Sequence, residues 1–550
     1  MSIYYPVAEM KVALDRAPKF REYLYCRGFL ITDHKQERLE DYPFYSNWNE
    51  RILNIKNKQL FVYTHKDAYL NVFEDADQIM FLVGHCYDPF SMLHEEGKIL
   101  QKLSAALKEG QDAFWDAESD LTGVFCVGYF NGDEVVYSTD CAGMQMVYHG
   151  VVGESVYISS HAKLVADLLD LEQPKYVKRL TNNRFWHYWG IWLPGDISPY
   201  DELKRMQPNH AAVYQMHEHT ERMYRYYPTK EIVEYTDERD CENVIKKLGQ
   251  IMENTMMLIS EKWPDKKVSL SATGGRDSMS ALACAKKVQD KFSYFSYISN
   301  YDESVDAYAA KDICASLGLE HEIVEIPDEW EGYEDIDVFK MVMESNSGCA
   351  GENNKNDLKK RMYFCEHPPC DIEIKSWVNE MGRGWYYNKY NKKTFPKYPT
   401  PSYWRCMHKA YIDDLWLIKE TDKIFAEYLD KYYSKEVFDK VSWLELYFWE
   451  FAWGGGEGRS LTSEHRVTYD ITIPFNNRKY VDLMLQISYL KRKEEYIPNH
   501  LITYMDKRIT DTGIVIKDVS HTNMRALLVR TYLEIYSKIK FLNEKKWRYR

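Results

Sequence analysis

The segment from Val268 to Val288 constrains the fold of this chain more than any other. Val268 to Ala272 is a short apolar run typical of a buried strand, and Ser278 to Val288 has helical periodicity. Between them, Thr273-Gly274-Gly275-Arg276-Asp277-Ser278 contains two adjacent glycines. Glycine lets the backbone approach a ligand closely, and the first N–H groups of a helix attract anions. The segment therefore predicts a phosphate-binding loop.

The side chains of this loop suit a nucleotide phosphate and its metal ion. Thr273 and Ser278 offer hydroxyl groups, and Asp277 is placed where a carboxylate could hold Mg²⁺ against phosphates. The spacing is not that of a Walker loop, because Gly-x-x-x-x-Gly-Lys is absent. The alternative is an ordinary strand-to-helix turn in which Asp277 caps the helix. The hydroxyl residues on both sides of the glycines favour the phosphate interpretation.

The segments around the loop alternate between helix and strand. A helix is expected over Cys241 to Glu261, strands over Phe292 to Ile298 and His321 to Ile326, and a second helix over Asp306 to Leu317. Strands that alternate with helices of this length are typical of a doubly wound parallel sheet. Beyond residue 335 the pattern is largely helical. We therefore expect an α/β domain with helical additions.

The first 225 residues have a different pattern. Gly123 to Phe130, the turn Asn131-Gly132-Asp133 and Glu134 to Ser138 predict a hairpin. A strand over Val156 to Ser160 precedes a helix over Ala162 to Leu169. Because strands and helices mix here without regular alternation, we expect an α+β domain. A chain of 550 residues exceeds one core, so residues 1–225 and 226–550 are predicted to form two domains.

Charge and cysteine content exclude some classes of function. The formal net charge of −13 argues against a nucleic-acid binder, although Lys545 to Arg550 forms a local basic patch, best interpreted as a solvated tail. The 11 cysteines lack paired Cys-x-x-Cys spacing, so we expect free thiols. With no signal peptide and no apolar run of membrane-spanning length, a cytoplasmic protein without membrane partners is expected. A homodimer is possible, and the sequence does not decide the oligomeric state.

The loop resembles the PP-loop, Ser-Gly-Gly-x-Asp-Ser, of the ATP pyrophosphatases. Three more segments are similar to the asparagine synthetase family: its second strand and helix, its acidic loop, and its late Arg-x-Pro-Phe-Leu-Asp segment. In this chain these are Phe295-Ser296-Tyr297 with Asp302, Asp306 and His321; Lys375 to Tyr386; and Asp470 to Phe475 with Val481. The resemblance covers most of the chain and implies ATP and Mg²⁺ as cofactors.

The resemblance also implies a set of site residues. Those expected to bind ATP are Ser271, Thr273, Gly274, Gly275, Asp277, Ser278, Phe295, Ser296 and Tyr297. Asp277 and Glu380 are expected to be catalytic and to hold Mg²⁺, with a surface salt bridge as the alternative for Glu380. Lys493, in the basic run from Lys491, is expected to supply the late catalytic cation, and a solvated basic cluster is the alternative.

Two further segments are unusual: the acidic loop, which differs from that of the family, and a run of glycines. The family's glycines before the acid are replaced here by Trp377, Val378 and Asn379, which suits a branch with a different acceptor. The run Gly454-Gly455-Gly456-Glu457-Gly458 could suggest a second anion-binding loop. No strand-to-helix context accompanies it, so we expect a flexible turn near the acceptor pocket.

The N-terminal domain resembles the class II glutamine amidotransferases, which have an N-terminal-nucleophile hydrolase fold. The matching segments include Leu121 to Tyr129, Asp140 to Tyr148, Ile158 to Leu164 and Leu193-Pro194-Gly195. Intact members carry a nucleophilic Cys after the initiator Met, where this chain has Ser2. Val83 replaces the Asn that stabilises the oxyanion. We therefore expect an inactive glutaminase, with Cys26, Cys86 and Cys126 as packing residues.

These features predict an ATP-dependent ligase that adenylates a small-molecule or peptide carboxylate and couples it to ammonia or an amine. The β-lactam synthetases and lasso-peptide cyclases are branches with substrate amines. Three alternatives stay open: an asparagine synthetase that uses glutamine through Ser2, a PP-loop enzyme that modifies tRNA or transfers sulfur, and a non-catalytic nucleotide-binding scaffold. The acidic charge and the missing Cys-x-x-Cys pairs count against the second, and Asp277 with Ser278 against the third.

Overall fold

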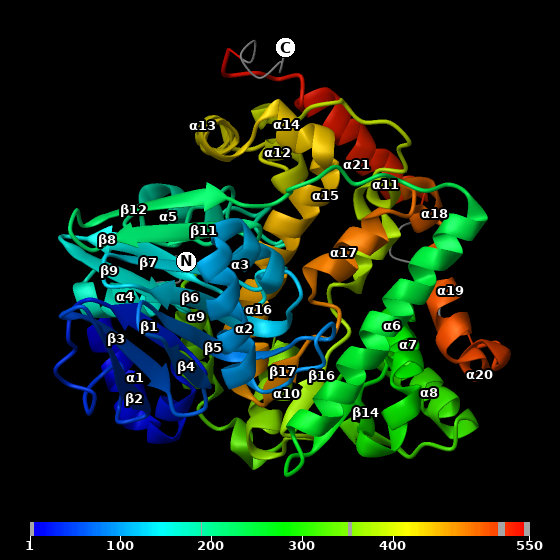
Figure 1. Ribbon diagram of the computed structural model, residues 1–550, viewed down its shortest axis with the longest axis horizontal. Coiled ribbons are helices and arrows are strands. Elements are labelled where there is room, and N and C mark those ends of the chain that lie inside the picture. Colours follow the sequence, from blue (N-terminus) through cyan, green and yellow to red (C-terminus); the bar gives the residue numbers. More distant parts are fainter. Residues whose placement is uncertain (1–4, 189, 350–354, 515–522, 544–550) are drawn as a thin grey trace.

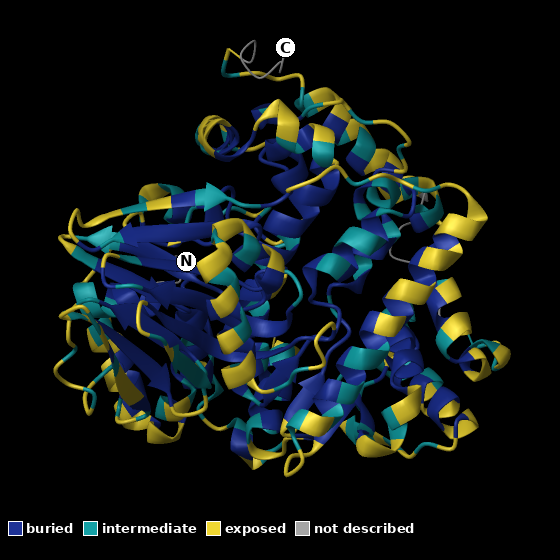
Figure 2. Cartoon of the chain, in the orientation of Figure 1, coloured by how far each residue is buried: buried dark blue, intermediate teal, exposed yellow. Residues whose placement is uncertain are grey.

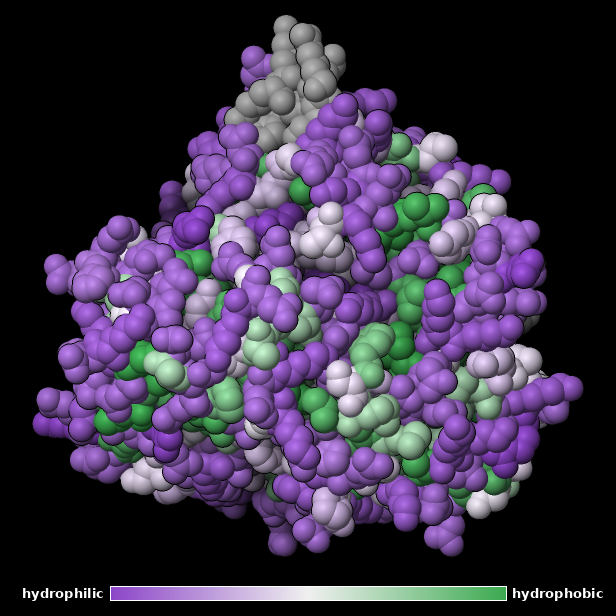
Figure 3. Space-filling view, viewed as in Figure 1, coloured by the Kyte–Doolittle hydropathy of each residue, from purple (hydrophilic) through white to green (hydrophobic). Residues whose placement is uncertain are grey.

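The computed structural model describes residues 5–188, 190–349, 355–514 and 523–543. Ser2 and the basic patch from Lys545 to Arg550 lie outside these residues. In Figure 1 the strands of the N-terminal half gather on one side, and most helices of the C-terminal half occupy the other. The face drawn in Figure 3 is mostly hydrophilic. No helix in the described ranges combines the length and the apolar character needed to cross a membrane.

Two antiparallel sheets of six strands each form the N-terminal half. The strand order is β10-β8-β9-β1-β3-β2 in the first sheet and β12-β11-β7-β6-β5-β4 in the second. The strands are β1 (Phe29–Thr32), β2 (Trp48–Ile55), β3 (Lys58–His65), β4 (Leu70–Glu74), β5 (Ile79–Tyr87), β6 (Thr122–Phe130), β7 (Glu134–Thr139), β8 (Tyr148–Val152), β9 (Ser155–Ser159), β10 (Lys204–Arg205), β11 (His210–Gln215) and β12 (Thr220–Arg225).

Helices cover the outer faces of both sheets. α2 (Glu96–Glu109) and α3 (Gln111–Glu118) pack on the second sheet. α1 (Val7–Arg16), α4 (Ala162–Leu169) and α9 (Ile336–Ser347) pack on the first. The inner faces of the two sheets share one apolar core, and their strands are largely buried (Figure 2). This layered mixture of sheets and helices agrees with the α+β expectation.

Local patterns in the N-terminal half were predicted well. The expected hairpin is β6 and β7, with Phe130 opposite Val135 across the turn. The helix expected over Ala162 to Leu169 is α4, with the same bounds. These elements follow from turn residues and side-chain periodicity, which act over a few residues.

A parallel sheet of five strands forms the centre of the C-terminal half. Its order is β15-β14-β13-β16-β17, with β13 (Val268–Ser271), β14 (Ser293–Ile298), β15 (His321–Glu325), β16 (Ile372–Ile374) and β17 (Asp470–Thr472). The chain therefore leaves β13 toward β14 and β15 and later returns to its other side as β16 and β17. Ligands of such sheets bind outside the carboxyl ends of the strands where the order reverses.

The helices after β13 and β14 begin earlier than predicted. α7 (Arg276–Cys284) begins directly after Gly275 and ends before Val288, whose φ of −129° interrupts the helical path. α8 (Tyr301–Ser316) begins five residues early. Asn300 caps it by accepting from the N–H of Glu303 at 2.9 Å, and the Glu303 carboxylate accepts from the N–H of Ser299 at 2.7 Å. These capping residues were visible in the sequence but were overlooked.

The prediction of a flexible turn at the glycine run was wrong. Gly454 to Glu457 end the π-helix η5 (Phe448–Glu457), and α16 (Gly458–Ser463) follows directly. A Cβ atom on Gly458 would lie 2.1 Å from the carbonyl oxygen of Gly143, and one on Gly454 would lie 2.5 Å from Pro208. The glycines therefore allow a helix of the C-terminal half to pass close to the N-terminal half.

A buried ion pair also joins the two halves. Arg225, at the end of β12, donates through Nη1 and Nη2 to Glu450 of η5 at 2.7 and 3.0 Å. The carboxylate of Glu450 is fully buried and accepts further hydrogen bonds from Asn209, Tyr428 and Tyr433. Both oxygens of this carboxylate are thus satisfied, as burial of a charge requires.

Candidate active site

The loop from Thr273 to Ser278 lies at the carboxyl end of β13, where the strand order reverses. Ser296 and Tyr297 of β14 lie on one side of it, and Lys375 and Ser376, directly after β16, lie on the other. The structure thus brings three segments far apart in the sequence to one edge of the parallel sheet, as the doubly wound arrangement requires.

Hydrogen bonds inside the loop use its hydroxyl groups. Ser278 Oγ donates to the carbonyl oxygen of Thr273 at 2.9 Å and accepts from the Thr273 N–H at 3.0 Å. Thr273 Oγ1 in turn accepts from the Gly275 N–H at 3.2 Å. Gly275 has a φ of −75°, so a left-handed backbone does not require glycine there, although a Cβ atom would press on Thr273 Oγ1 at 3.2 Å. The loop is held in shape by its own side chains.

Asp277 and Glu380 form a pair of carboxylates beside the loop. Asp277 accepts from Asn379 Nδ2 at 2.9 Å and from Arg383 Nη2 at 2.7 Å. Burial, and then the charge of Asp277, raise the pKa of Glu380 to about 8. Glu380 Oε2 is buried and has no hydrogen-bond partner among the described residues. Two adjacent carboxylates with an unsatisfied oxygen fit a divalent cation that prefers oxygen ligands, such as Mg²⁺.

Two cavities meet at these carboxylates. We name the smaller one, of about 320 Å³, the loop cavity. It is lined by Ser271, Ala272, Thr273, Asp277, Ser278, Ser296, Tyr297, Glu303, Asp306, Ala307, Glu373, Lys375, Ser376, Trp377 and Glu380. The larger one, of about 530 Å³, is the aromatic cavity. It is lined by His187, Gly190, Trp192, Asp277, Trp377, Glu380, Arg383, Trp385, Tyr386, Lys389, Phe448, Ala452, Trp453, Glu457, Arg525, Ala526 and Val529.

Most of the site residues expected from the sequence come together at the loop cavity. Seven of them line it: Ser271, Thr273, Asp277, Ser278, Ser296, Tyr297 and Glu380. Gly274 and Gly275 shape the loop without lining the cavity, and the Phe295 side chain is buried in the core. Lys493, on α18 (Tyr489–Lys493), donates to Asn391 Oδ1 at 3.3 Å and lines neither cavity. The structure does not bring Lys493 to the other predicted residues.

The basic residues that do reach the site were not predicted. Arg383 pairs with Asp277, and Lys375 lines the loop cavity while Lys389 and Arg525 line the aromatic cavity. Arg383 could have been found, because it follows Glu380 by three residues and such residues share one side of a 3₁₀ turn. That turn, η4 (Asn379–Arg383), carries the carboxylate and the cation together. No local pattern marked the other three.

Val378, which precedes this turn, has an unusual backbone. Its φ of 80° and ψ of −22° lie in the left-handed region, which a β-branched residue rarely adopts, and its side chain is fully buried. We expect Val378→Gly to be more stable than Val378→Ala by about 1 kcal/mol, because both lose the valine contacts but only alanine keeps the strain. Urea denaturation of the two variants measures the difference.

The buried Val342, in the interior of α9, provides the matched control for this comparison. There the order should reverse, with the glycine variant less stable than the alanine variant by about 1 kcal/mol, because the backbone is helical. An alanine variant at Val378 that is the more stable of its pair would contradict the strained backbone.

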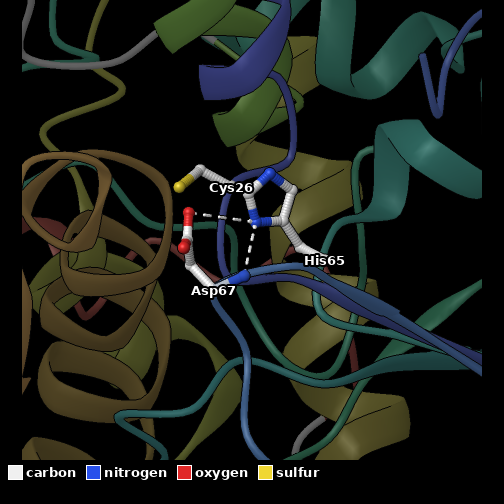
Figure 4. A group of neighbouring side chains, drawn as sticks. All are labelled: Cys26, His65 and Asp67. Carbon is white, nitrogen blue, oxygen red and sulfur yellow. Dashed lines mark hydrogen bonds and ion pairs between the residues drawn. The ribbon is translucent and has the colours of Figure 1, made fainter. Parts of the chain in front are cut away.

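Cys26, His65 and Asp67 form a small polar group at the end of β3 (Figure 4). Their ligand atoms lie within 4.8 Å of one another, close enough to share a metal ion. However, His65 Nε2 lies 3.1 Å from the carbonyl oxygen of Glu22, and Nδ1 accepts from the Asp67 N–H at 3.2 Å. Burial raises the pKa of the Cys26 thiol to about 11. The thiol is therefore protonated at neutral pH, as in a packing cysteine.

The other residues considered for the glutaminase site are also in the core. Val83 and Cys86 of β5 and Cys126 of β6 are buried, and burial raises the pKa of both thiols. Gly84 has a φ of 112°, and a Cβ atom there would lie 2.2 Å from the carbonyl oxygen of Val124. The glycine is therefore required by the close approach of β6. These features agree with packing roles for the two cysteines.

Comparisons with known proteins give limited information. No protein-family model matches the sequence, and a search of curated proteins finds no match. One similar solved structure is the allosteric regulatory enzyme of purine biosynthesis, with 11% identity over 60% of this chain and 76% of that chain, and a TM-score of 0.24. Another is glutamine phosphoribosylpyrophosphate amidotransferase from B. subtilis in complex with ADP and GMP, with 10% identity, 62% and 77% coverage, and a TM-score of 0.22. Similarities this weak do not place the chain in a family.

Proposed function

We propose that this chain is an ATP-dependent ligase that activates a substrate carboxylate as its adenylate, releases pyrophosphate and forms an amide. The observation that supports this most directly is that two cavities meet at one pair of carboxylates. Asp277 and Glu380 line both the loop cavity and the aromatic cavity. Attack of a carboxylate on the α-phosphorus of ATP requires two substrates side by side, with positive charge between them.

Different residues would bind the two substrates, ATP and the carboxylate. The start of α7 offers backbone N–H groups to the phosphates of ATP, and Lys375 adds a cation on the other side of the loop cavity. Asp277 and Glu380 would hold Mg²⁺, whose positive charge stabilises the leaving pyrophosphate. Arg383, which pairs with Asp277, lies on the aromatic side and can orient the reacting carboxylate. An amine then attacks the acyl-adenylate, and AMP leaves.

The order of the parallel strands supports our proposal of a ligase of the asparagine synthetase type, which the sequence resembles. The resemblance placed ATP at the loop after β13 and at β14, and residues from both segments line the loop cavity. The N-terminal half has Val83 in the core in place of an oxyanion donor. We therefore propose that the amine is ammonia or a substrate amine taken from solution rather than ammonia made from glutamine.

The test is an assay for pyrophosphate release with a panel of carboxylates and amines. We expect release to require Mg-ATP and a carboxylate together, and to stop when Mg²⁺ is removed with EDTA. The nucleotide product should be AMP. Release of ADP and phosphate, or a rate unaffected by every carboxylate tried, would contradict the proposal.

Glutamine should not replace the amine in this assay. With a good carboxylate and saturating ATP, glutamine alone is expected to give no amide and no glutamate above background, because Val83 cannot donate to the oxyanion from its side chain. Ammonium chloride or the substrate amine should restore amide formation. Chromatography of glutamate measures the result, and glutamate release in step with AMP would show that the glutaminase is active.

A further inference from the structure

The aromatic cavity has apolar walls that a small polar substrate would leave uncovered. Its aromatic lining consists of Trp192, Trp377, Trp385, Tyr386, Phe448 and Trp453. Phe448 connects two of these rings: its ring is stacked on Trp385 at 5.8 Å between centroids and lies 5.1 Å from Trp453. Flat apolar surfaces of this kind gain most from a ligand that buries apolar or aromatic area against them.

The charged groups of the cavity come from two different sets of elements. Asp277 and Glu380, with Arg383, come from α7 and η4 and form the reacting side. Lys389 comes from α11 (Trp385–Lys389) and Arg525 from α21 (Asn523–Tyr536). In Figure 1, α11 and α21 lie together, well away from α7. The cavity therefore extends from the carboxylates to a second, basic side.

The two basic residues on this second side influence each other. Burial, and then the charge of Arg525, lower the pKa of Lys389 to about 7. Both cations line the aromatic cavity and lie near each other, so one anionic group could contact both. His187 and Glu457 complete the polar lining of the cavity, and Glu457 lies near enough to Glu380 to raise its pKa. The basic side therefore suits the anionic group of a ligand.

We propose that the aromatic cavity binds a carboxylic acid with a flat aromatic body and a second anionic group. The reacting carboxylate would lie at Arg383, the body between the aromatic walls, and the second anion at Lys389 and Arg525. The naming of a substrate class rests on the proposed function, because that function requires a carboxylate in this cavity. Free aspartate has no aromatic body and would leave the aromatic walls exposed to water.

Isothermal titration calorimetry without nucleotide tests the cavity by itself. The probes are 4-(2-carboxyethyl)benzoate, which has two carboxylates on an aromatic body, 3-phenylpropionate, which has one, and aspartate. We expect the dicarboxylate to bind about tenfold more tightly than the monocarboxylate, because it adds a charge-assisted hydrogen bond. Aspartate should show no saturable binding. Equal affinity of the two aromatic acids, or tighter binding of aspartate, would overturn the proposal.

Variants of the basic side locate the second anion. Arg525→Met should lower the affinity for the dicarboxylate about tenfold and leave that for the monocarboxylate within about twofold. Arg530, on the same helix, donates to the carbonyl oxygen of Asn391 and does not line the cavity, so Arg530→Met is the matched control. An Arg525 variant that binds both acids as the unmodified protein does would also overturn the proposal.

Proton uptake gives a second readout for Lys389. An anion bound beside this amine raises its pKa, so binding of the dicarboxylate near pH 8 should take up a proton, and its affinity should fall as the pH rises above 7. Calorimetry in buffers of different ionisation enthalpy measures the uptake, which Lys389→Met should abolish. If the acids bind as described but no carboxylate triggers pyrophosphate release, the proposed function fails while the inference about the cavity holds. If pyrophosphate release shows no preference for aromatic acids, the inference about the cavity fails while the proposed function holds.

Discussion

Replacing Asp277 by asparagine is expected to lower carboxylate-dependent pyrophosphate release about a thousandfold. Asp277 lines both cavities, as Glu380 does, and it also pairs with Arg383 and raises the pKa of Glu380. An amide at this position keeps the shape and the hydrogen bond to Asn379 in part, but it removes one of two charges that would hold Mg²⁺. The rate with saturating Mg-ATP and the best carboxylate measures the effect.

A matched variant separates this loss from a general effect of charge. Asp302, in the first turn of α8, is exposed and lines neither cavity, so Asp302→Asn should leave the rate within about twofold. Thermal melting should show that the Asp277 variant is folded. A folded Asp277→Asn enzyme with a rate close to that of the unmodified protein would rule out the metal-binding role of Asp277.

Replacing Glu450 by alanine is expected to destabilise the fold by about 3–5 kcal/mol. The substitution leaves the buried guanidinium of Arg225 without its carboxylate, and it removes the acceptor for Asn209, Tyr428 and Tyr433. Because the pair connects β12 of the N-terminal half with η5 of the C-terminal half, both halves should lose stability together. Urea denaturation followed by circular dichroism and by tryptophan fluorescence measures the free energy of unfolding.

Two controls test the origin of this loss. The double variant Arg225→Met with Glu450→Met should lose less stability than Glu450→Ala alone, because it leaves no buried unpaired charge. Glu436→Gln, which breaks the exposed pair with Lys440, should change the free energy of unfolding by less than about 0.5 kcal/mol. A loss for Glu450→Ala no greater than that of the exposed pair would contradict the assigned role.

The same pair predicts how stability depends on pH. Burial acts to raise the pKa of Glu450, but the charge of Arg225 and the hydrogen bonds outweigh it, so the folded pKa lies below the ordinary value. A carboxylate with a lowered folded pKa contributes stability above the unfolded pKa, and this contribution is lost as the pH falls through the folded pKa. Denaturation midpoints of the unmodified protein and the double variant should therefore converge in acid.

Local features of the fold could be predicted because their causes lie within a few residues. The hairpin of β6 and β7, the helix α4 and the strand–loop–helix unit at β13 follow from turn residues and from the periodicity of apolar side chains. The early start of α8 was missed although its capping residues were visible. The prediction of a flexible turn at Gly454 to Gly458 was wrong, because these glycines let η5 and α16 pass close to Gly143 and Pro208 of the N-terminal half. The residues next to the glycines in the sequence do not reveal this contact.

The residues of the candidate site could likewise be predicted only in part. The residues of the loop cavity could be named because a motif and a resemblance pointed to them, and they come together around β13, β14 and β16. Lys493 was chosen for its place in the sequence, yet it lines neither cavity. Lys389 and Arg525 could not have been found, because each is an ordinary basic residue on an ordinary helix until packing directs both into the aromatic cavity.

By itself the sequence determined the local elements, including the strand, the loop with two glycines and the helix around residues 268–284. Capping, turn chemistry and periodicity act through short-range contacts and need no knowledge of the remaining chain. The tertiary structure alone decided that Asp277 faces Glu380 and Arg383, and that aromatic side chains from distant segments enclose one cavity beside them. Such proximity depends on how whole faces of helices and sheets pack, because burial of apolar area is not directional and no local pattern specifies its partner.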